Sequence, residues 1–479
     1  MLPSPARLTL SALVLLCGTA LAVPKHDVLR ARRPAGTEYF GLYLLDKKVG
    51  WLATSVGALP SGDVATDNRL AFIASVGGRR SERHHHEQRT YDGRPGGKLK
   101  SFVFQQTGDG GDQRLEGTCL ADKLTVKRTR PNAAEETLTF PPCTERTEQA
   151  DPVRVALLRK QPVGGPTLDF MDLKHWTVRA TPGESTTRVL GGVKTQLRTV
   201  TLLSEKEKVP VKNLVTDEGE VVEVNFGTNF FARAEPEQTA MRMDVAEVFS
   251  LTRVVLPAPL PEAALKVPGE VQLVISGLPA EFHVQTARQT YKKLAEGRVA
   301  LTLRAPAPPA KSPRFPLADP DKGPNLEPTL AVESNAASIR ELSARLVKGQ
   351  PDAWAAARAI NRWVWEKVEK NYGASSDRAT DVLRTLQGDC TEHSLLTVSL
   401  LRAAGIPARR VDGLIYLRQS DGVPAYYWHE WVEAYVGEWV QMDPTFNEEV
   451  ALPTHLALGL EGDARITPLL GTLKVHEVR

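Results

Sequence analysis

The sequence predicts a multi-domain protein. A β-rich N-terminal region, formed as an antiparallel sheet, a half-barrel or a sandwich, precedes a C-terminal α+β domain. From residue 37 to 245, short runs of alternating polar and apolar residues are separated by turn residues. Eight prolines then fall within residues 305–328. After residue 331, apolar residues recur at helical spacing before strand-like runs return. The 479 residues are enough for two to four domains.

The composition is that of a globular protein, with 42% hydrophobic and 24% charged residues. The net charge of +3 is too small to indicate a nucleic-acid partner.

At the N-terminus, Arg7 precedes an apolar run from Leu8 to Leu16 and the sequence Ala20-Leu21-Ala22. This pattern predicts a secretory signal peptide over residues 1–22, so we expect an exported protein, periplasmic or secreted. No other stretch reaches the roughly 18 apolar residues of a membrane span.

The chain has four cysteines, and Cys17 would leave with the signal peptide. Cys119, Cys143 and Cys390 then remain in an oxidising compartment. Cys119 and Cys143 lie close together in the strand-rich region, where they form either a disulfide or two buried free thiols. If they pair, Cys390 is the leftover thiol of the mature chain.

In the β-rich region, the sequence TEYFGLYLLDKKVGWLATSVGAL predicts two strands joined by a turn at residues 46–48. Residues 84–86 are consecutive histidines, and consecutive strand residues point to opposite faces, so we expect an exposed basic strand and no metal site. A second β stretch at residues 250–304 predicts a small β domain or an extension of the first. The proline-rich residues 305–330 predict an extended, semi-rigid linker.

The domain predicted at residues 331–479 begins with two helices, separated near Gly349-Gln350-Pro351, and the second ends near Asn371. A further helix starts at Cys390 and stops at Gly405, because a glycine followed closely by a proline is typical of helix ends. Three strand-like runs then complete an α+β domain: ARRVDGLIYL, YYWHEWVEAYV and EWVQMDP.

Cys390 lies at the start of its helix rather than among the leucines of its core. Asp389 can cap this helix, and Glu392 three residues later completes a capping box. The unpaired N–H groups of the first turn favour an anion, so we expect the thiolate form of Cys390 to be stabilised. Gly388 would leave the sulfur accessible. This setting favours a reactive thiol over a core cysteine.

A reactive thiol needs a proton acceptor and a group that orients the acceptor. His429 lies in the strand YYWHEWVEAYV, and Asp443 ends the next strand, just before Pro444. Neighbouring antiparallel strands can bring the two side chains together, facing the helix that begins at Cys390. Each residue alone is weak support, but the ordered set of three on suitable elements is specific. His393, one turn after Cys390, either tunes the thiol or makes a structural hydrogen bond.

These motifs resemble the transglutaminase-like core, a branch of the papain-type superfamily of cysteine catalysis. The resemblance rests on three stretches: GDCTEHSLLTVSLLRAAGIPARRVDGL, WHEWVEAY and WVQMDPTF. It extends over roughly the last 150 residues, whose end resembles the C-terminal extension of bacterial members. The resemblance implies that Cys390 is the nucleophile, His429 the general acid/base and Asp443 the residue that orients His429. It also implies acyl transfer through a thioester, resolved by water in a hydrolase or peptidase, or by an amine in a transglutaminase.

The oxyanion of such a reaction would be held by the backbone N–H of Cys390 and one further donor, for which Gln387, Tyr427 and Trp428 are candidates. We found no phosphate loop, dinucleotide fingerprint or paired metal-ligand motif in the sequence, so no cofactor or metal is expected. The expected partner is a protein or peptide substrate, such as one of the cell envelope, and the oligomeric state stays open. The alternative is a non-catalytic envelope binding protein that uses its β-rich region, with the C-terminal core as a scaffold.

Overall fold

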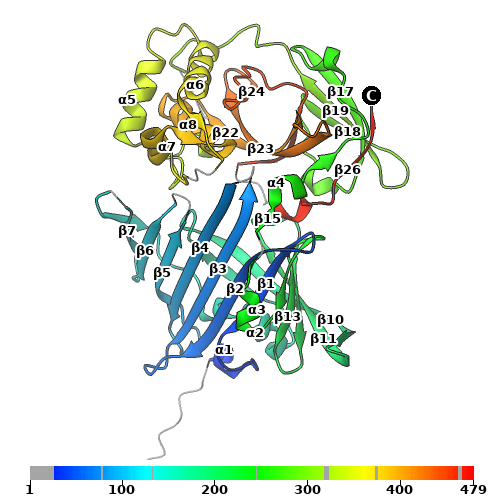
Figure 1. Ribbon diagram of the computed structural model, residues 1–479. Helices are drawn as coiled ribbons and strands as arrows, with labels where there is room; N and C mark the ends of the chain where they lie inside the picture. The colour runs from blue at the N-terminus through cyan, green and yellow to red at the C-terminus, as the bar shows by residue number, and fades with distance from the viewer. Residues whose placement is uncertain are drawn as a thin grey trace, which may run out of the picture.

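The computed structural model shows a large curved sheet with a second unit of helices and shorter sheets stacked on one end (Figure 1). It describes residues 26–76, 79–108, 111–131, 133–243, 245–317, 323–372, 376–461 and 466–479. The expected signal peptide at residues 1–22 therefore lies outside the described residues. Within the described ranges, no helix has the length and apolar character needed to cross a membrane.

The large sheet is built from two antiparallel meanders that join along one strand pair. The first meander is β1–β8: Glu38–Leu44, Lys47–Ala58, Val64–Val76, Arg79–Tyr91, Leu99–Thr107, Gln113–Cys119, Leu124–Thr129 and Glu136–Phe140. The second is β9–β14: Val163–Asp169, Lys174–Leu190, Val193–Ser204, Val211–Thr216, Val221–Asn225 and Phe230–Ala234. β1 pairs with β14, and the short β15 (Ala246–Glu247) adds to β3 in parallel. The predicted β-rich, antiparallel N-terminal region is confirmed.

Two short helices, α1 (Asp27–Arg30) and α2 (Pro152–Arg159), pack beside the second meander, where α2 contacts β9, β10 and β11. Asp151 caps α2 by accepting from the backbone N–H of Arg154 at 3.2 Å. Cys119 and Cys143 form a disulfide, which decides between the two alternatives left open by the sequence. Among the described residues, Cys390 is then the free cysteine.

The turn between β1 and β2 is centred one residue earlier than expected. Leu45 and Asp46 both have positive φ, at 49° and 62°, while Lys47 already pairs with Leu44. Positive φ at both central residues is the geometry of a two-residue type I′ hairpin, which matches the twist of the flanking strands. The chain thus accepts left-handed backbone at Leu45 in order to form the tighter turn.

Two smaller sheets lie in the second unit. One has β16 (Val254–Val255), β22 (Ala408–Arg418), β23 (Pro424–Tyr435), β24 (Trp439–Met442) and β25 (His455–Leu460). The other has β17 (Gly269–Ser276), β18 (Gln289–Lys293), β19 (Val299–Ala305) and β26 (Lys474–Val478). β16 pairs with β23, and β26 pairs with β17. The region expected at 250–304 thus adds β16 to the sheet of the region expected at 331–479. In return, that region adds β26 to the sheet of residues 250–304.

Four helices cover one side of the β22–β25 sheet: α5 (Ala337–Leu346), α6 (Ala353–Lys367), α7 (Ala379–Thr385) and α8 (Cys390–Ala403). The central helix, α8, contacts the other three helices as well as β22 and β23. It ends before Gly405, which has a φ of +78°. The shorter helices are α3 (Glu237–Ala240), α4 (Val248–Leu251), η1 (Thr147–Ala150), η2 (Glu262–Ala264), η3 (Ala280–Phe282), η4 (Gly323–Asn325) and η5 (Thr467–Leu469).

The proline-rich segment lies against the helical unit. Ser312 accepts from the backbone N–H of Trp354 at 2.9 Å, and the carbonyl of Pro313 accepts from the N–H of Ala353 at 2.9 Å. Both N–H groups belong to the first turn of α6, which has no intrahelical partners for them. Phe315 and Leu317 pack against the core of this unit. The segment thus supplies hydrogen bonds and apolar contacts to the start of α6.

Candidate active site

The site forms where one edge of β23 is left open. β22 pairs along the other edge, and two short strands share the open one: β16 opposite residues 425–426 and β24 opposite residues 432–435. Between these two strands, the described residues provide no strand partner for residues 427–431 on this open edge. The first turn of α8 occupies this gap.

The start of α8 is fixed by the predicted capping box, which the structure confirms. The Asp389 carboxylate accepts from the N–H of Thr391 at 2.8 Å, and the Glu392 carboxylate accepts from the N–H of Asp389 at 2.8 Å. Gly388 is required here for a reason other than sulfur access. A Cβ at this position would lie 2.1 Å from the Cβ of Glu392. The glycine therefore makes room for the capping glutamate.

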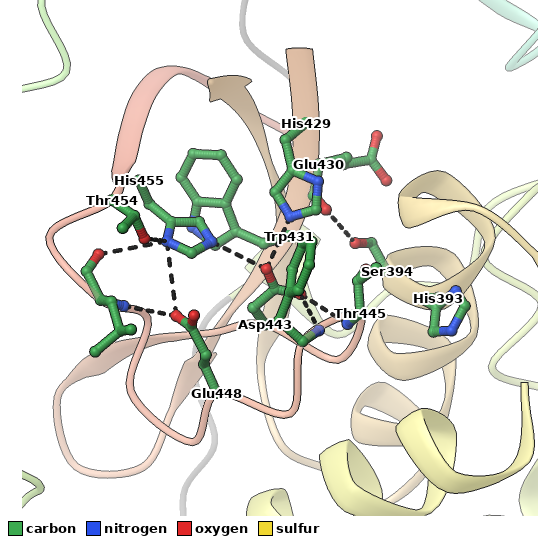
Figure 2. A network of polar contacts seen from close by, with 12 residues as sticks. His393, Ser394, His429, Glu430, Trp431, Asp443, Thr445, Glu448, Thr454 and His455 are labelled. Atoms are coloured by element: carbon green, nitrogen blue, oxygen red, sulfur yellow. Dashed lines mark hydrogen bonds and ion pairs between the residues drawn. The ribbon is translucent and has the colours of Figure 1, made fainter. Parts of the chain in front are cut away.

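The start of α8 lies against the backbone of Glu430. The N–H of Glu430 faces the sulfur of Cys390. The hydroxyl of Ser394 donates to the Glu430 carbonyl at 3.0 Å (Figure 2). The N–H and C=O of one strand residue point to the same edge. The open edge of β23 thus places the Cys390 sulfur beside the residue that follows His429.

Asp443 holds the ring of His429. Its Oδ2 lies 2.8 Å from Nε2 of His429, while its Oδ1 accepts from the backbone N–H groups of Thr445 at 2.7 Å and Phe446 at 3.2 Å. An ionised carboxylate can only accept hydrogen bonds, so Nε2 of His429 carries the hydrogen. The Nδ1 atom is then the free base of this histidine.

A second histidine contacts the same carboxylate oxygen. Nε2 of His455, at the start of β25, lies 2.9 Å from Oδ2 of Asp443, so the two imidazole rings flank the carboxylate (Figure 2). Sequence reasoning missed His455. Its only local signal is a histidine at the first position of an apolar strand, THLALGL, and the pairing of β25 with β22 is what brings it to Asp443.

Asp443 is fully buried, and burial alone would raise its pKa. The contacts with His429 and His455 outweigh burial and hold the pKa of Asp443 well below its usual range. One nitrogen or oxygen atom from each of these three side chains lies within 4.8 Å of the other two, a spacing that also suits a metal ion. Each of the three closest atoms already takes part in a hydrogen bond.

Cys390 and His429 line one cavity of about 330 Å³. One wall is apolar and includes Phe249 of α4 and Leu470 from the C-terminal segment. Phe249 stacks on Tyr427 with a ring distance of 4.7 Å. Because α4 follows directly on β15, which pairs with β3 of the large sheet, the N-terminal region contributes to this wall.

The thiol of Cys390 is not in the electrostatic setting that the sequence suggested. Cys390 keeps partial contact with solvent, but burial of its sulfur and the neighbouring carboxylate of Asp389 raise the pKa of the thiol well above its ordinary value. The N–H of Glu430 acts in the opposite direction and is outweighed. The expected stabilisation of a thiolate by the helix start is therefore overcome by burial and by the capping aspartate.

The other candidate residues have contacts of their own. Both ring nitrogens of His393 lie near backbone carbonyls, at 2.6 Å from Asp389 and 3.2 Å from Val368. These are structural hydrogen bonds, the second alternative drawn from the sequence. They tie the start of α8 to the end of α6.

Three side chains were candidates for the oxyanion donor. Gln387 accepts from Asn371 at 3.0 Å, and Tyr427 accepts from Arg253 at 3.4 Å. Trp428 lines the cavity with Cys390 and His429, and its indole N–H donates to the carbonyl of Thr252 at 3.3 Å. The structure thus brings Trp428, rather than Gln387 or Tyr427, to the cavity.

Residues 340–444 match the family model of the transglutaminase-like superfamily. The second unit of the chain therefore contains a transglutaminase-like core domain, and the resemblance seen in the sequence is confirmed. Over 152 residues, the chain is 27% identical to an uncharacterised protein of Mycobacterium leprae; the match covers 30% of this chain and 53% of that protein. It thus spans about half the length of that relative.

Three solved structures show distant likeness to this chain. A proposed cysteine protease from Cytophaga hutchinsonii aligns with a TM-score of 0.29 and 18% identity, over 45% of this chain and 83% of its own. A β-barrel-like domain of unknown function from Brucella abortus aligns at 0.31 and 14%, over 42% and 94%. A proposed protease from Parabacteroides distasonis aligns at 0.20 and 11%, over 80% and 69%. At these TM-scores the alignments carry no functional argument.

Proposed function

We propose that this protein is an exported thiol-dependent acyl-transfer enzyme that acts on peptide or carboxamide bonds. One observation carries the proposal: Cys390 and His429 line the same cavity, and Asp443 holds Nε2 of His429 so that Nδ1 is the free base. A transglutaminase-like core around these residues supports it. Cys390 is the nucleophile, His429 the general acid/base and Asp443 the orienting residue.

In the first half-reaction, Nδ1 of His429 accepts the proton of the Cys390 thiol as the sulfur attacks the carbonyl carbon. The raised pKa of this thiol means that the proton leaves during the attack rather than beforehand. The oxyanion receives a hydrogen bond from the backbone N–H of Cys390, at the start of α8. The C–N bond then breaks, His429 gives its proton to the departing amine or ammonia, and a thioester remains on Cys390.

In the second half-reaction, water or a primary amine attacks the thioester, and Nδ1 of His429 accepts a proton from that nucleophile. The C–S bond breaks, and the proton returns to the sulfur. Water gives a carboxylic acid and makes the protein a hydrolase or peptidase. An amine gives a new amide and makes it a transglutaminase.

The test is a product assay on the mature full-length protein with protein and cell-envelope peptide substrates. Ammonia release with incorporation of a labelled amine would identify a transglutaminase, and new peptide N-termini would identify a peptidase. Cys390→Ala and His429→Ala should abolish either product, and the thioester should appear by mass spectrometry on the peptide that contains Cys390. His84→Ala, at a part-exposed histidine on β4, is the matched control and should retain full activity. Product formation by Cys390→Ala would refute the proposal.

Export is part of the same proposal. The pattern of residues 1–22 supports it, and so does the Cys119–Cys143 disulfide, since disulfides persist in oxidising compartments. Cell fractionation followed by N-terminal sequencing should find a mature chain that begins at Val23. A chain that keeps residues 1–22 and stays in the cytoplasm would contradict export without affecting the catalytic proposal.

A further inference from the structure

The carboxylate of Asp443 receives four hydrogen bonds, more than a group that only orients His429 requires. Two backbone N–H groups occupy Oδ1, and two imidazole Nε2 atoms share Oδ2, from His429 at 2.8 Å and from His455 at 2.9 Å. His455 is almost fully buried, with 2% of its surface exposed. A buried polar side chain that the reaction does not touch calls for a physical role.

The contacts around the ring of His455 place a hydrogen on Nε2, directed at Asp443. Asp443 can only accept, so Nε2 of His455 carries a hydrogen, and Nδ1 lies 3.0 Å from the hydroxyl of Thr454, which can donate to it. On the other side, Nδ1 lies 3.3 Å from the carbonyl of Leu452. The indole of Trp431, on β23, packs edge-on with a ring distance of 4.9 Å.

Charged groups face His455 from the neighbouring elements. These are Asp443 and Glu448 from the loop after β24, His429 from β23, and Arg288, which precedes β18 and whose guanidinium interacts with Glu448. Glu448 lies 3.7 Å from Nδ1 of His455, and burial raises the pKa of its carboxyl. When His429 takes up the thiol proton, Asp443 can balance one positive charge in this buried pair.

A second donor on Oδ2 has two effects on His429. It fixes the rotation of the carboxylate, so that Oδ2 stays in line with Nε2 of His429. It also shares the negative charge of Oδ2, so that the oxygen attracts the hydrogen of His429 less strongly. Both effects keep Nδ1 of His429 unprotonated and directed away from Asp443 before the attack.

We infer that His455 is a positioning residue that donates its Nε2 hydrogen to Asp443 and thereby keeps the ring of His429 in place with Nδ1 unprotonated. The inference rests on the proposed function for its catalytic meaning, but the protonation of Nδ1 can be measured without substrate. His455 is not among the residues that line the cavity of Cys390 and His429; it acts through Asp443.

The test compares ¹⁵N-histidine-labelled wild type with His455→Ala and His455→Gln by NMR, with His429 assigned through His429→Ala. In wild type at neutral pH, Nδ1 of His429 should resonate as an unprotonated nitrogen. In His455→Ala, Nδ1 should become protonated at a higher pH, because Asp443 attracts the His429 hydrogen more strongly. His455→Gln, whose amide can donate to Oδ2, should restore the wild-type state. His26→Ala, at another buried histidine, should leave His429 unchanged.

Kinetics provide a second measurement. His455→Ala should lower kcat by about 10- to 100-fold while KM changes by less than twofold, since misplacement of a catalytic group acts on the transition state. The acidic limb of the pH profile should move to higher pH, and His455→Gln should move it back. A loss of stability alone would not move this limb. If His455→Ala leaves both the protonation of Nδ1 in His429 and the acidic limb unchanged, His455 is only a packing residue and the inference fails.

The outcomes separate the two proposals. If no acyl transfer depends on Cys390, the proposed function fails, while the NMR comparison still supports or refutes His455. If acyl transfer depends on Cys390 but His455→Ala has no effect on His429, the positioning inference alone fails. Titration of wild type with Zn²⁺ covers the remaining case. Tight binding that requires His429, Asp443 and His455 would make His455 a metal ligand and overturn the inference.

Discussion

The groups around Cys390 act on the ionisation of its thiol in opposite directions. The start of α8 and the N–H of Glu430 favour the thiolate, whereas burial and Asp389 favour the thiol and prevail. Asp389 therefore has two roles, because it caps the helix that presents the sulfur and suppresses ionisation of that sulfur. The two roles can be separated by one substitution.

Asp389→Asn should make Cys390 more reactive at a given pH. Asparagine caps helices as well as aspartate does, so α8 keeps its start, but the negative charge beside the sulfur is lost. The pKa of the thiol should then fall, which shifts its thiolate fraction to lower pH. Iodoacetamide labelling of wild type should rise only at a pH above the ordinary range for cysteine, and the labelling curve of the variant should lie at lower pH.

The matched control is Asp352→Asn, which makes the same change at the cap of α6, where Asp352 accepts from the N–H of Ala355 at 2.8 Å. Its labelling curve should coincide with that of wild type. A curve for Asp389→Asn that is unshifted, or shifted to higher pH, would show that Asp389 does not suppress ionisation of Cys390.

At the residue scale, sequence reasoning could find groups whose signal is local. Cys390 was found from a capped helix start, and His429 and Asp443 from consecutive strands. His455 was beyond its reach because it arrives through the pairing of β25 with β22. The raised pKa of Cys390 was missed for a similar reason, since burial of the sulfur depends on how α8 docks against β23.

At the element scale, α8 is held against β23 by Ser394, whose hydroxyl donates to the Glu430 carbonyl at 3.0 Å. Ser394→Ala would leave this buried carbonyl without its partner and should destabilise the protein by about 1–2 kcal/mol. Activity should fall as well, because the Cys390 sulfur and His429 are set by the same docking. Chemical denaturation and initial rates measure the two effects.

Ser399→Ala is the matched control for this substitution. Ser399 is also fully buried on α8, but its hydroxyl donates within the helix, to the carbonyl of Leu395 at 2.7 Å. When this hydroxyl is removed, no group on β23 loses a hydrogen-bond partner. Alanine also has a higher helix propensity than serine. Equal losses of activity in the two variants would mean that the bond from Ser394 to Glu430 does not set the site.

The helix α4 contributes to the cavity from outside the transglutaminase-like core. Phe249→Ala should enlarge the cavity wall and raise KM by about tenfold, the equivalent of roughly 1.4 kcal/mol, while kcat changes little. The measurement uses the substrate found in the product assay. Phe140→Ala, on the edge strand β8, is the control and should leave KM unchanged. A fall in kcat alone would place Phe249 outside substrate binding.

Helix ends and hairpins could be predicted where glycine, proline or other turn residues mark them in the sequence. Gly405 and Pro407 marked the end of α8, and the strands β22, β23 and β24 were all anticipated. The turn at Leu45 and Asp46 was misplaced by one residue, because a left-handed leucine has no sequence signal. α4 was missed because a four-residue helix is too short for apolar periodicity.

At the scale of the whole molecule, the sequence predicted the order of the regions but not how they are joined. Strand exchange through β16 and β26 links segments more than 150 residues apart, and no local pattern encodes such pairing. The junction between the large sheet and the helical unit is also formed by residues that are far apart in the sequence. There, Glu333 faces Arg128 and Arg130 of the sheet region at 3.8 and 3.6 Å.

This junction should be a main determinant of stability for the full chain. Arg128 is 3% exposed, and burial lowers the pKa of its guanidinium to about 10, which shows how strongly this charge depends on nearby carboxylates. Glu333 also accepts from the N–H and hydroxyl of Thr380, in α7, at 3.0 and 2.5 Å. One carboxylate thus links the sheet to the helical unit that carries Cys390.

Glu333→Gln keeps an oxygen for Thr380 but removes the charge that faces the buried arginines. The variant should lose about 2 kcal/mol of unfolding free energy, because the buried arginines lose one of two facing carboxylates and keep Glu136. Its unfolding should also separate into two transitions as the units uncouple.

Denaturation followed by tryptophan fluorescence reports chiefly on the helical unit, which holds most of the tryptophans, and circular dichroism reports on the sheet. Glu135→Gln, in the exposed pair with Lys127 at 2.8 Å, is the matched control and should leave a single transition with an unchanged midpoint. If Glu333→Gln behaves like this control, the two units are held together by their shared strands rather than by this charge.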